Sequence, residues 1–273
     1  MTAPSDDQLW LRPQQASPIG QLGRALLDGV AALRDVYRVL LLTLYYTARG
    51  ERSTRTVLRQ MYEIGNRSLG FLCVVMGFIG MILVYQGGLQ TQRVVPDLSM
   101  LGATFLQLLV RDLAASICAL MLATRVGAGI AAEIGSMVVT EQVDALRMCA
   151  TDPIDYLIKP RFVASLATFG ALVVIAALVA FLAGMWTAQA FFGINPRTFA
   201  NTSMVHVGDL VIGLTKCVAY GAAIPVISGY CGLTAFGGSE GVGAATTNAV
   251  VSSSLAVIVL NFLISGTGYL VFG

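Results

Sequence analysis

Four polar side chains lie inside stretches that are otherwise long and apolar. They are Arg111, Asp112, Lys216 and Asn261. An ionisable group within the hydrocarbon region of a membrane costs a few kcal/mol, so it normally faces a partner or a water-filled cavity. Two cations and an amide at similar depth could bind the anionic headgroup of an amphiphile, because both kinds of side chain donate hydrogen bonds to phosphate oxygens.

The same charges could instead satisfy one another and only fix helix packing. Arg111 would then pair with Asp112, and Lys216 with Asp209. Neighbouring residues of a helix point about 100° apart, and Asp209 lies two turns from Lys216, so neither pairing is favoured within its own helix. At this stage a headgroup cavity and structural ion pairing both stay open.

The four residues agree in depth if their stretches cross the membrane. At about 1.5 Å of rise per residue, Arg111 lies roughly 16 Å and Lys216 about 10 Å below the outer surface. Asn261 lies about 20 Å up from the cytoplasmic surface. The polar side chains therefore converge on the outer half of the membrane.

A second polar feature is the segment "VTEQVDALRMCATDPIDYLIKPR", residues 139–161. It holds seven charged side chains in 23 residues, although the chain is only 12% charged and 56% hydrophobic. Thr140 can cap a short helix whose first turn carries Glu141, and Asp152-Pro153 is a natural stop. The pattern predicts a short surface helix between two apolar stretches.

This short helix is expected to have two faces. Val143, Leu146 and Ala150 mark an apolar side, and Asp144 and Arg147 are neighbours at i, i+3 on a charged side. Such a helix can dock on its own protein and present its charges to a partner.

Several chemistries have no support in the sequence. The only lysines are Lys159 and Lys216, neither follows a glycine, and no phosphate-binding loop exists. His206 is the sole histidine, and no Cys/His cluster has metal-ligand spacing. Residues 252–254 are serines without a candidate base. We therefore expect no enzyme activity, no metal and no cofactor bound by this chain.

Five apolar stretches must position these residues. Each is about as long as a membrane-spanning helix needs, at 66–90, 100–124, 162–186, 209–236 and 248–272. The expected fold class is an all-α integral membrane protein with five transmembrane helices. Gly127, Ala131 and Gly135 recur every four residues, which favours close helix packing.

Residues 21–48 have helical periodicity but too many charges to span. Apolar side chains recur at three- and four-residue steps, at Leu22, Leu26, Val30, Leu33, Tyr37, Leu40 and Leu44. This pattern predicts an amphipathic helix along the membrane surface or packed on the bundle. The expected organisation is a polar tail (1–20), a cytoplasmic or interfacial helical lead-in (21–65) and a transmembrane domain (66–273).

Basic residues predict the orientation. Nine of the 17 Lys and Arg precede or begin the first span, whereas residues 90–99 and 187–205 hold one Arg each. The positive-inside bias places the N-terminus and residues 139–161 in the cytoplasm. With five spans, the C-terminus is expected on the opposite side. The segment 237–247 is expected to form a turn.

The segment "AAEIGSMVVTEQVDALRMCATDPIDYLIKPRF" resembles the signature of the MlaE (YrbE) family of ABC-transporter permeases. The family pattern runs E-I-G, then T-E-Q-[IVL], a variable helix, D-P and P-R-[FV]. The likeness extends from about Leu58 to the C-terminus and includes "VVSSSLAVIVLNFLI" in the last span.

The resemblance implies a homodimeric permease in the bacterial inner membrane, with an interfacial helix and five spans per subunit. Its expected partners are a cytoplasmic ABC ATPase that uses ATP and Mg, a periplasmic ring of MCE-domain proteins and a small cytoplasmic accessory protein. Membrane lipids, and no nucleic acid, are expected to bind. Such transporters move phospholipids or related lipids between inner and outer membranes and are linked to outer-membrane lipid asymmetry.

By this likeness, residues 140–152 resemble the coupling helix that contacts the ATPase, marked by Thr140, Glu141, Gln142, Asp144, Arg147, Asp152 and Pro153. Arg111, Asp112, Lys216 and Asn261 match polar positions of the lipid cavity. The chain departs from the family where R-E-L-G-P is replaced by Arg111 to Ala115, "RDLAA", and where Asn261 stands for a common Asp.

Two other classes of function remain open at this stage. A secondary transporter or channel would favour proton-carrying acids in mid-span and inverted repeats, yet Asp112 is the only central acid. A scaffold that only anchors partner proteins would not need Arg111 and Lys216. Replacing these two residues would then leave lipid traffic unchanged.

Overall fold

The computed structural model describes residues 18–49, 54–94 and 100–272, and these ranges are helical with no β-strand. Five helices are long and apolar enough to cross a membrane, namely Thr54–Arg93, Leu101–Val139, Ile154–Phe192, Val207–Leu233 and Gly238–Val271. The chain is therefore an all-α, multi-pass integral membrane protein, as the sequence predicts. Residues 1–17 of the expected polar tail lie outside the described ranges.

Two spans are longer than their apolar windows. Helix α2 (Thr54–Val94) continues residues 54–65 of the expected lead-in directly into the first span. Helix α10 (Gly238–Phe272) includes most of the segment expected to be a turn, and that prediction is wrong. The chain reverses instead at Gly237 and Gly238, whose positive φ angles of 95° and 75° suit glycine. No proline follows them to stop the helix.

The second span is one continuous helix interrupted twice by wider π turns. In order, it consists of α3 (Leu101–Leu108), η2 (Leu109–Leu113), α4 (Ala114–Leu122), η3 (Ala123–Gly127) and α5 (Ala128–Val139). A π turn shifts the register of the side chains that follow and often marks a functional site. Two of the span's three charged side chains before residue 130, Arg111 and Asp112, lie in η2, and Arg125 lies in η3.

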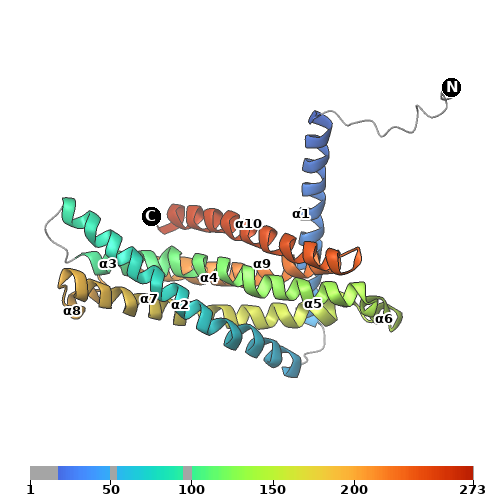
Figure 1. Cartoon of the computed structure of the whole chain (residues 1–273), viewed down its shortest axis with the longest axis horizontal. Coiled ribbons are helices and arrows are strands. Elements are labelled where there is room, and N and C mark those ends of the chain that lie inside the picture. Colours follow the sequence, from blue (N-terminus) through green and yellow to red (C-terminus); the bar gives the residue numbers. More distant parts are fainter. Residues whose placement is uncertain (1–17, 50–53, 95–99, 273) are drawn as a thin grey trace, which may run out of the picture.

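The spans pack side by side in one elongated bundle (Figure 1). Helices α2 and α7 (Lys159–Phe192) share the largest interface, and a Cβ at Gly80 would collide with the backbone of Ala180. Helix α9 (Val207–Leu233) lies centrally, with 56% of its most apolar window buried, against 17% for α10. One face of α10 is therefore left without a partner among the residues that the structure describes.

Helix α1 (Pro18–Arg49) crosses the bundle and projects away from it (Figure 1). Val39 and Thr43 are buried against the bundle, whereas Val30 and Leu33 of the predicted apolar face are 64% and 71% exposed. The helix thus docks through its C-terminal half, on a neighbouring face to the predicted one. Its contacts with α7 and α9 decide which side chains are covered.

The other residues of the predicted apolar face of α1 differ in how far they are buried. Tyr37 and Leu44 are exposed and Leu40 is partly buried, whereas the side chains of Leu22 and Leu26 lie outside the described ones. An apolar stripe on the projecting part therefore stays uncovered within the described chain. This is the surface that an interfacial helix offers to a membrane.

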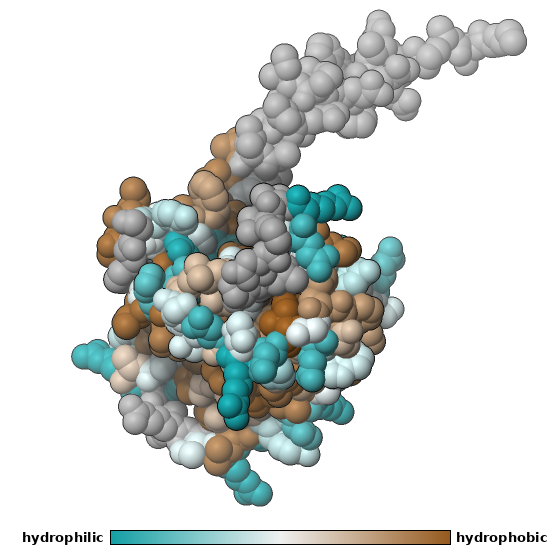
Figure 2. Space-filling view, turned by 90° about the vertical axis from the view of Figure 1, so that its left-hand side faces the viewer, coloured by the Kyte–Doolittle hydropathy of each residue, from teal (hydrophilic) through white to brown (hydrophobic). Residues whose placement is uncertain are grey.

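The two ends of the bundle differ from its flanks. Figure 2 looks onto the end where α3 and α8 (Pro196–Phe199) lie, and hydrophilic side chains project from it among apolar ones. The short α6 (Gln142–Met148) lies at the opposite end (Figure 1). The two polar features found in the sequence therefore lie at different heights along the bundle.

Candidate functional site

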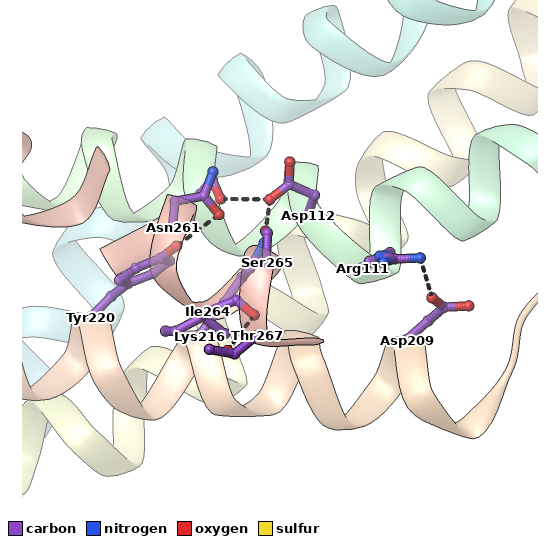
Figure 3. A network of polar contacts seen from close by, with 10 residues as sticks. Arg111, Asp112, Asp209, Lys216, Tyr220, Asn261, Ile264, Ser265 and Thr267 are labelled. Atoms are coloured by element: carbon purple, nitrogen blue, oxygen red, sulfur yellow. Dashed lines mark hydrogen bonds and ion pairs between the residues drawn. The ribbon is translucent and has the colours of Figure 1, made fainter. Parts of the chain in front are cut away.

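Lys216 forms the centre of a polar network inside the bundle. Its side chain is fully buried, and its Nζ donates to Asp112 Oδ1 and to Ser265 Oγ, the latter at 2.8 Å (Figure 3). The three residues come from α9, η2 and α10. A buried ammonium is stable only with such partners, because burial removes its hydration.

Arg111 forms the second ion pair of the network. Its guanidinium lies 3.5 Å from Asp209 Oδ1 and 4.5 Å from the ring centre of Tyr269 on α10. Asp209 is buried at the start of α9, where its Oδ2 accepts a hydrogen bond from the backbone N–H of His206 at 3.0 Å. Gln107 Nε2 donates to the same oxygen at 3.4 Å. The carboxylate thus caps α9 and holds Arg111.

Asn261 lies beside these pairs (Figure 3), and no hydrogen bond joins its side chain to Arg111 or Lys216 in the part of the chain that the structure describes. Its Oδ1 accepts a hydrogen bond from Tyr220 OH at 3.1 Å, and Ser116 Oγ donates to Asp112 Oδ1 at 3.4 Å. The structure therefore brings all four sequence-predicted residues into one region, where α9, α10 and the second span meet.

The partners within the network differ from those considered from the sequence. Arg111 pairs with Asp209 and Lys216 with Asp112, so each cation takes the acid of the other helix (Figure 3). Adjacent residues of one helix diverge, as the spacing argument requires, and the crossed pairs join η2 to α9. The pairs therefore fasten two spans and also leave no unpaired cation among these four groups.

The network is only partly sealed. The side chains of Asp112 and Arg111 are 41% and 22% exposed, whereas those of Asp209 and Lys216 are 5% and 0% exposed. An anionic group that enters from the exposed side could replace a carboxylate as partner of Arg111 or, after a side-chain movement, of Lys216. The exchange would keep each cation paired, and a displaced Asp112 carboxylate could be hydrated because its side chain is 41% exposed.

Five members of the network were missed by the sequence analysis. Ser265 and Tyr269 follow Asn261 at steps of four, and Tyr220 follows Lys216 at the same step. Gln107 precedes Arg111 by four residues, and Ser116 follows Asp112 by four. Residues i and i+4 lie on the same face of a helix. A search for polar residues at four-residue steps from Arg111, Asp112, Lys216 and Asn261 would have found all five.

The short surface helix is α6, but its ends differ from the prediction. Thr140 does not cap it, because its Oγ1 donates back to Ser136 O at 2.8 Å and it ends α5. Glu141 precedes α6 with a left-handed φ of 60°, and α6 stops at Met148, before Ala150 with a φ of 55°. These two reversals detach α6 from the flanking spans.

Asp152 and Pro153 begin the third span and do not terminate α6. Asp152 Oδ1 accepts from the backbone N–H of Ile154 at 2.9 Å, and its Oδ2 accepts from Tyr46 OH at 2.7 Å. The hydrogen bond to this carboxylate, followed by burial and the charges of Asp152 and Asp155, raises the pKa of Tyr46 above 10.0. Asp152 thus links α1 to the start of the third span.

α6 has the expected two faces at Val143 and Leu146, but Ala150 of the predicted apolar side lies beyond its end and is exposed. Val143 is buried at 3% exposure among apolar side chains of α5, α7 and α9, whereas Met148 is 89% exposed. Asp144 and Arg147 pair at 3.1 Å with side chains 66% and 62% exposed, and Gln142 and Glu141 are also exposed. The helix is anchored on one side and presents a charged, accessible surface on the other.

The small residues Gly127, Ala131 and Gly135 face α9 within the same chain. A Cβ at Gly127 would lie 2.9 Å from Ser228 Oγ, and one at Gly135 would lie 3.3 Å from Ala235 Cβ. Ala131 is fully buried. Their size lets the half of the second span nearer to α6 approach α9 closely.

Comparison with known proteins assigns the family. The model of the family described as permease MlaE matches residues 57–267. A probable ABC transporter permease of Synechocystis is 37% identical over 235 residues, covering 81% of this chain and 86% of the relative. A protein of the same description from Rickettsia felis is 36% identical over 211 residues, covering 77% and 81%.

A plant protein is also similar. The chloroplastic protein TRIGALACTOSYLDIACYLGLYCEROL 1 of Arabidopsis thaliana is 32% identical over 251 residues, covering 91% of this chain and 69% of the relative. The region that the family model matches contains α6, most of each of the five spans, and the polar network apart from Tyr269. The chain belongs to the MlaE permease family.

Proposed function

We propose that the chain is the permease subunit of an ATP-driven transporter that moves phospholipids or related lipids between the inner and outer membranes of a double-membrane bacterium. The observation that carries this proposal is the fully buried Lys216, held by charged and polar partners inside an apolar bundle. So costly a group at this depth is a site for a charged or polar ligand by default.

The chemical class of the substrate follows from the lining of the network. A phosphate group offers several strong acceptors to a guanidinium and an ammonium, and acyl chains suit the apolar helices around them. The name of the Arabidopsis relative is that of a glycerolipid, which supports a lipid substrate. Asn261, where the family often has Asp, makes this chain's network less acidic.

ATP hydrolysis is assigned to a partner. Relatives named as ABC transporter permeases support an ABC ATPase at the cytoplasmic face, which would use ATP and Mg. The exposed charges of α6 are the surface we propose for that contact, while its buried Val143 would transmit movement into α5, α7 and α9. This chain then remains a non-catalytic transport subunit.

The proposed setting follows the charge bias and the family likeness. The N-terminus and α6 face the cytoplasm, the C-terminus faces the periplasm, and the chain lies in the inner membrane. The uncovered face of α10 is available for a second copy, since only 17% of its apolar window is buried. A periplasmic MCE ring and a small cytoplasmic accessory protein complete the proposed assembly.

Charge reversal on α6 tests the coupling. We expect Asp144→Lys with Arg147→Glu, in the purified complex reconstituted in proteoliposomes, to abolish ATP-dependent transfer of a fluorescent phospholipid while the subunits still insert and assemble. The control Asp144→Glu with Arg147→Lys keeps the signs of both charges and should transfer lipid normally. Wild-type transfer by the reversed pair would refute the coupling role.

A further inference from the structure

A polar crevice lies between α2 and the cytoplasmic half of the second span. Its volume is about 420 Å³, and it is lined by Gln60, Glu63, Ile64, Arg67, Ser68, Arg125, Val126, Gly129, Ile130 and Glu133. None of these residues belongs to the network of Lys216. At about 1.5 Å per residue, Arg125 lies roughly 21 Å along the span from Arg111, so the crevice is a separate site.

Both carboxylates of the crevice are already paired with arginines outside it. Glu133 Oε1 lies 2.8 Å from Arg161, which is buried at 4% exposure, and Glu63 Oε1 lies 3.3 Å from Arg59. In contrast, Arg67 and Arg125 also line the crevice. Their guanidinium groups form no ion pair or hydrogen bond with any residue that the structure describes. Two guanidiniums are thus left with unused donors.

The charge balance favours an anion. The lining holds two arginines and two glutamates, but both glutamates are paired with Arg59 and Arg161 outside it, so the charges of Arg67 and Arg125 are left without a paired carboxylate among the described residues. A guanidinium binds phosphate through parallel hydrogen bonds in a fixed planar geometry, and two of them facing one cleft can hold a single phosphate group.

The height of the crevice points to the source of that phosphate. Arg67 opens the apolar stretch 66–90 and Arg125 follows the apolar stretch 100–124, so both lie where hydrocarbon gives way to headgroups. Arg125 lies on the π turn η3, as Arg111 lies on η2. Each of the two π turns in this span therefore carries an arginine that borders a polar region.

We infer that Arg67 and Arg125 bind the phosphate of a glycerophospholipid headgroup in the cytoplasmic leaflet, at a second lipid site distinct from the network of Lys216. The assignment to this leaflet rests on the orientation proposed above. The occupant would keep its acyl chains against the apolar flanks of α2 and the second span while its phosphate enters the crevice.

Gly129 offers a way to block the crevice without changing its charge. A Cβ at this position would meet nothing within 4 Å among the described residues, so a larger side chain begins in open space. Gly129→Leu should therefore fold normally and fill part of the crevice.

The test measures binding of dioctanoylphosphatidylglycerol to the purified complex by native mass spectrometry. We expect Arg67→Gln with Arg125→Gln, and separately Gly129→Leu, to weaken binding at this site at least tenfold. The control pair Arg55→Gln with Arg93→Gln removes the same charge elsewhere on α2 and should bind as the wild type does. Arg67→Lys with Arg125→Lys should recover part of the affinity.

Further ligands separate the possible sources of the phosphate. Dioctanoylglycerol, which lacks phosphate, should bind equally weakly to all variants. If inorganic phosphate or glycerol phosphate competes as well as the phospholipid, the ligand is a soluble phosphate and the lipid assignment is wrong. If the glutamine pair loses its ATPase partner but keeps its lipid, the crevice is a protein contact and the inference also fails.

The outcome is independent of the main transport proposal. Variants of Lys216 should lose transport but retain phospholipid at the crevice, and the glutamine pair should retain the lipid held by the Lys216 network. Unchanged phospholipid binding by both the glutamine pair and Gly129→Leu would overturn the second site, whatever happens to transport.

Discussion

The buried network and the surface helix α6 both contain ion pairs between an aspartate and a lysine or arginine. The pairs differ in how far their side chains are exposed to solvent. Lys216 is 0% exposed beside Asp112, whereas Asp144 and Arg147 are 66% and 62% exposed. Water can replace a lost partner on α6, but it cannot do so readily at Lys216. We therefore expect the inner pairs to contribute to the stability of the fold, and the outer pair to contribute little to it.

The largest effect is expected when Lys216 loses its carboxylate partner, Asp112. Asp112→Ala should lower the free energy of unfolding by about 2–3 kcal/mol, less than for a fully buried pair because Asp112 is 41% exposed. Denaturant unfolding in mixed micelles measures the loss. The double variant Asp112→Ala with Lys216→Met should recover most of it, since no buried charge then lacks a partner.

If Asp112→Ala lowers the free energy of unfolding by less than about 0.5 kcal/mol, the buried pair contributes no more than the exposed Asp144–Arg147 pair on α6. The buried network would then not fasten the second span to α9, and its difference from α6 would disappear.

The second pair of the network should give a smaller effect. Asp209→Asn keeps an acceptor for the His206 N–H but removes the charge facing Arg111, and we expect a loss of about 1–2 kcal/mol. Arg111 is 22% exposed and also lies over the ring of Tyr269, so it keeps part of its environment. The same unfolding measurement applies.

A double-mutant cycle isolates that contact. Arg111→Met should cause a smaller loss in the Asp209→Asn background than in the wild type. Equal losses in both backgrounds would show that the two charges do not interact.

On α6 the stability effect should nearly vanish. Asp144→Ala is expected to change the free energy of unfolding by no more than about 0.5 kcal/mol, because the pair with Arg147 is exposed and screened. The measurement is the same micellar unfolding, with Val143→Ala as a control that removes a buried side chain of the same helix. A larger effect for Asp144→Ala than for Val143→Ala would contradict the division into two faces.

The smallest effect concerns pH and the link between α1 and Asp152. The pKa of Tyr46 is raised above 10.0 by its hydrogen bond to Asp152, so the bond stabilises the docked helix below pH 10. The stabilisation is lost as pH rises through the higher, folded-state pKa, because the phenolate cannot donate. Tyr46→Phe should remove this dependence in unfolding curves recorded above pH 10, and an unchanged curve would exclude the linkage.

Sequence periodicity and length predicted the five spans, because a membrane helix needs a long apolar run and little else. The ends of the helices were harder to predict from the sequence. Residues 238–247 look like a turn by composition, yet they extend α10, and Thr140 looks like a cap yet bonds back to Ser136. Composition did not exclude helix at 238–247, and the Thr140 hydroxyl has an alternative local acceptor four residues earlier in α5.

The sequence predicted four residues of the candidate site but not the ion pairs that they form. Sequence placed Arg111, Asp112, Lys216 and Asn261 at similar depth, and the structure gathers them. The exchange of partners between η2 and α9 depends on how two helices are rotated against each other. Spacing within one helix carries no information on that rotation.

The most direct test of whether the buried charges take part in lipid transport is ATP-dependent phospholipid transfer by a complex that lacks the Asp112–Lys216 pair. Asp112→Leu with Lys216→Met removes both partners of the buried pair, and the control Arg34→Met with Asp35→Leu removes an exposed pair on α1. Fluorescent phospholipid transfer from proteoliposomes should fall at least tenfold in the first variant and stay unchanged in the second, with ATP hydrolysis and assembly intact in both. Transfer at the wild-type rate by Asp112→Leu with Lys216→Met would contradict a role for the network in lipid transport.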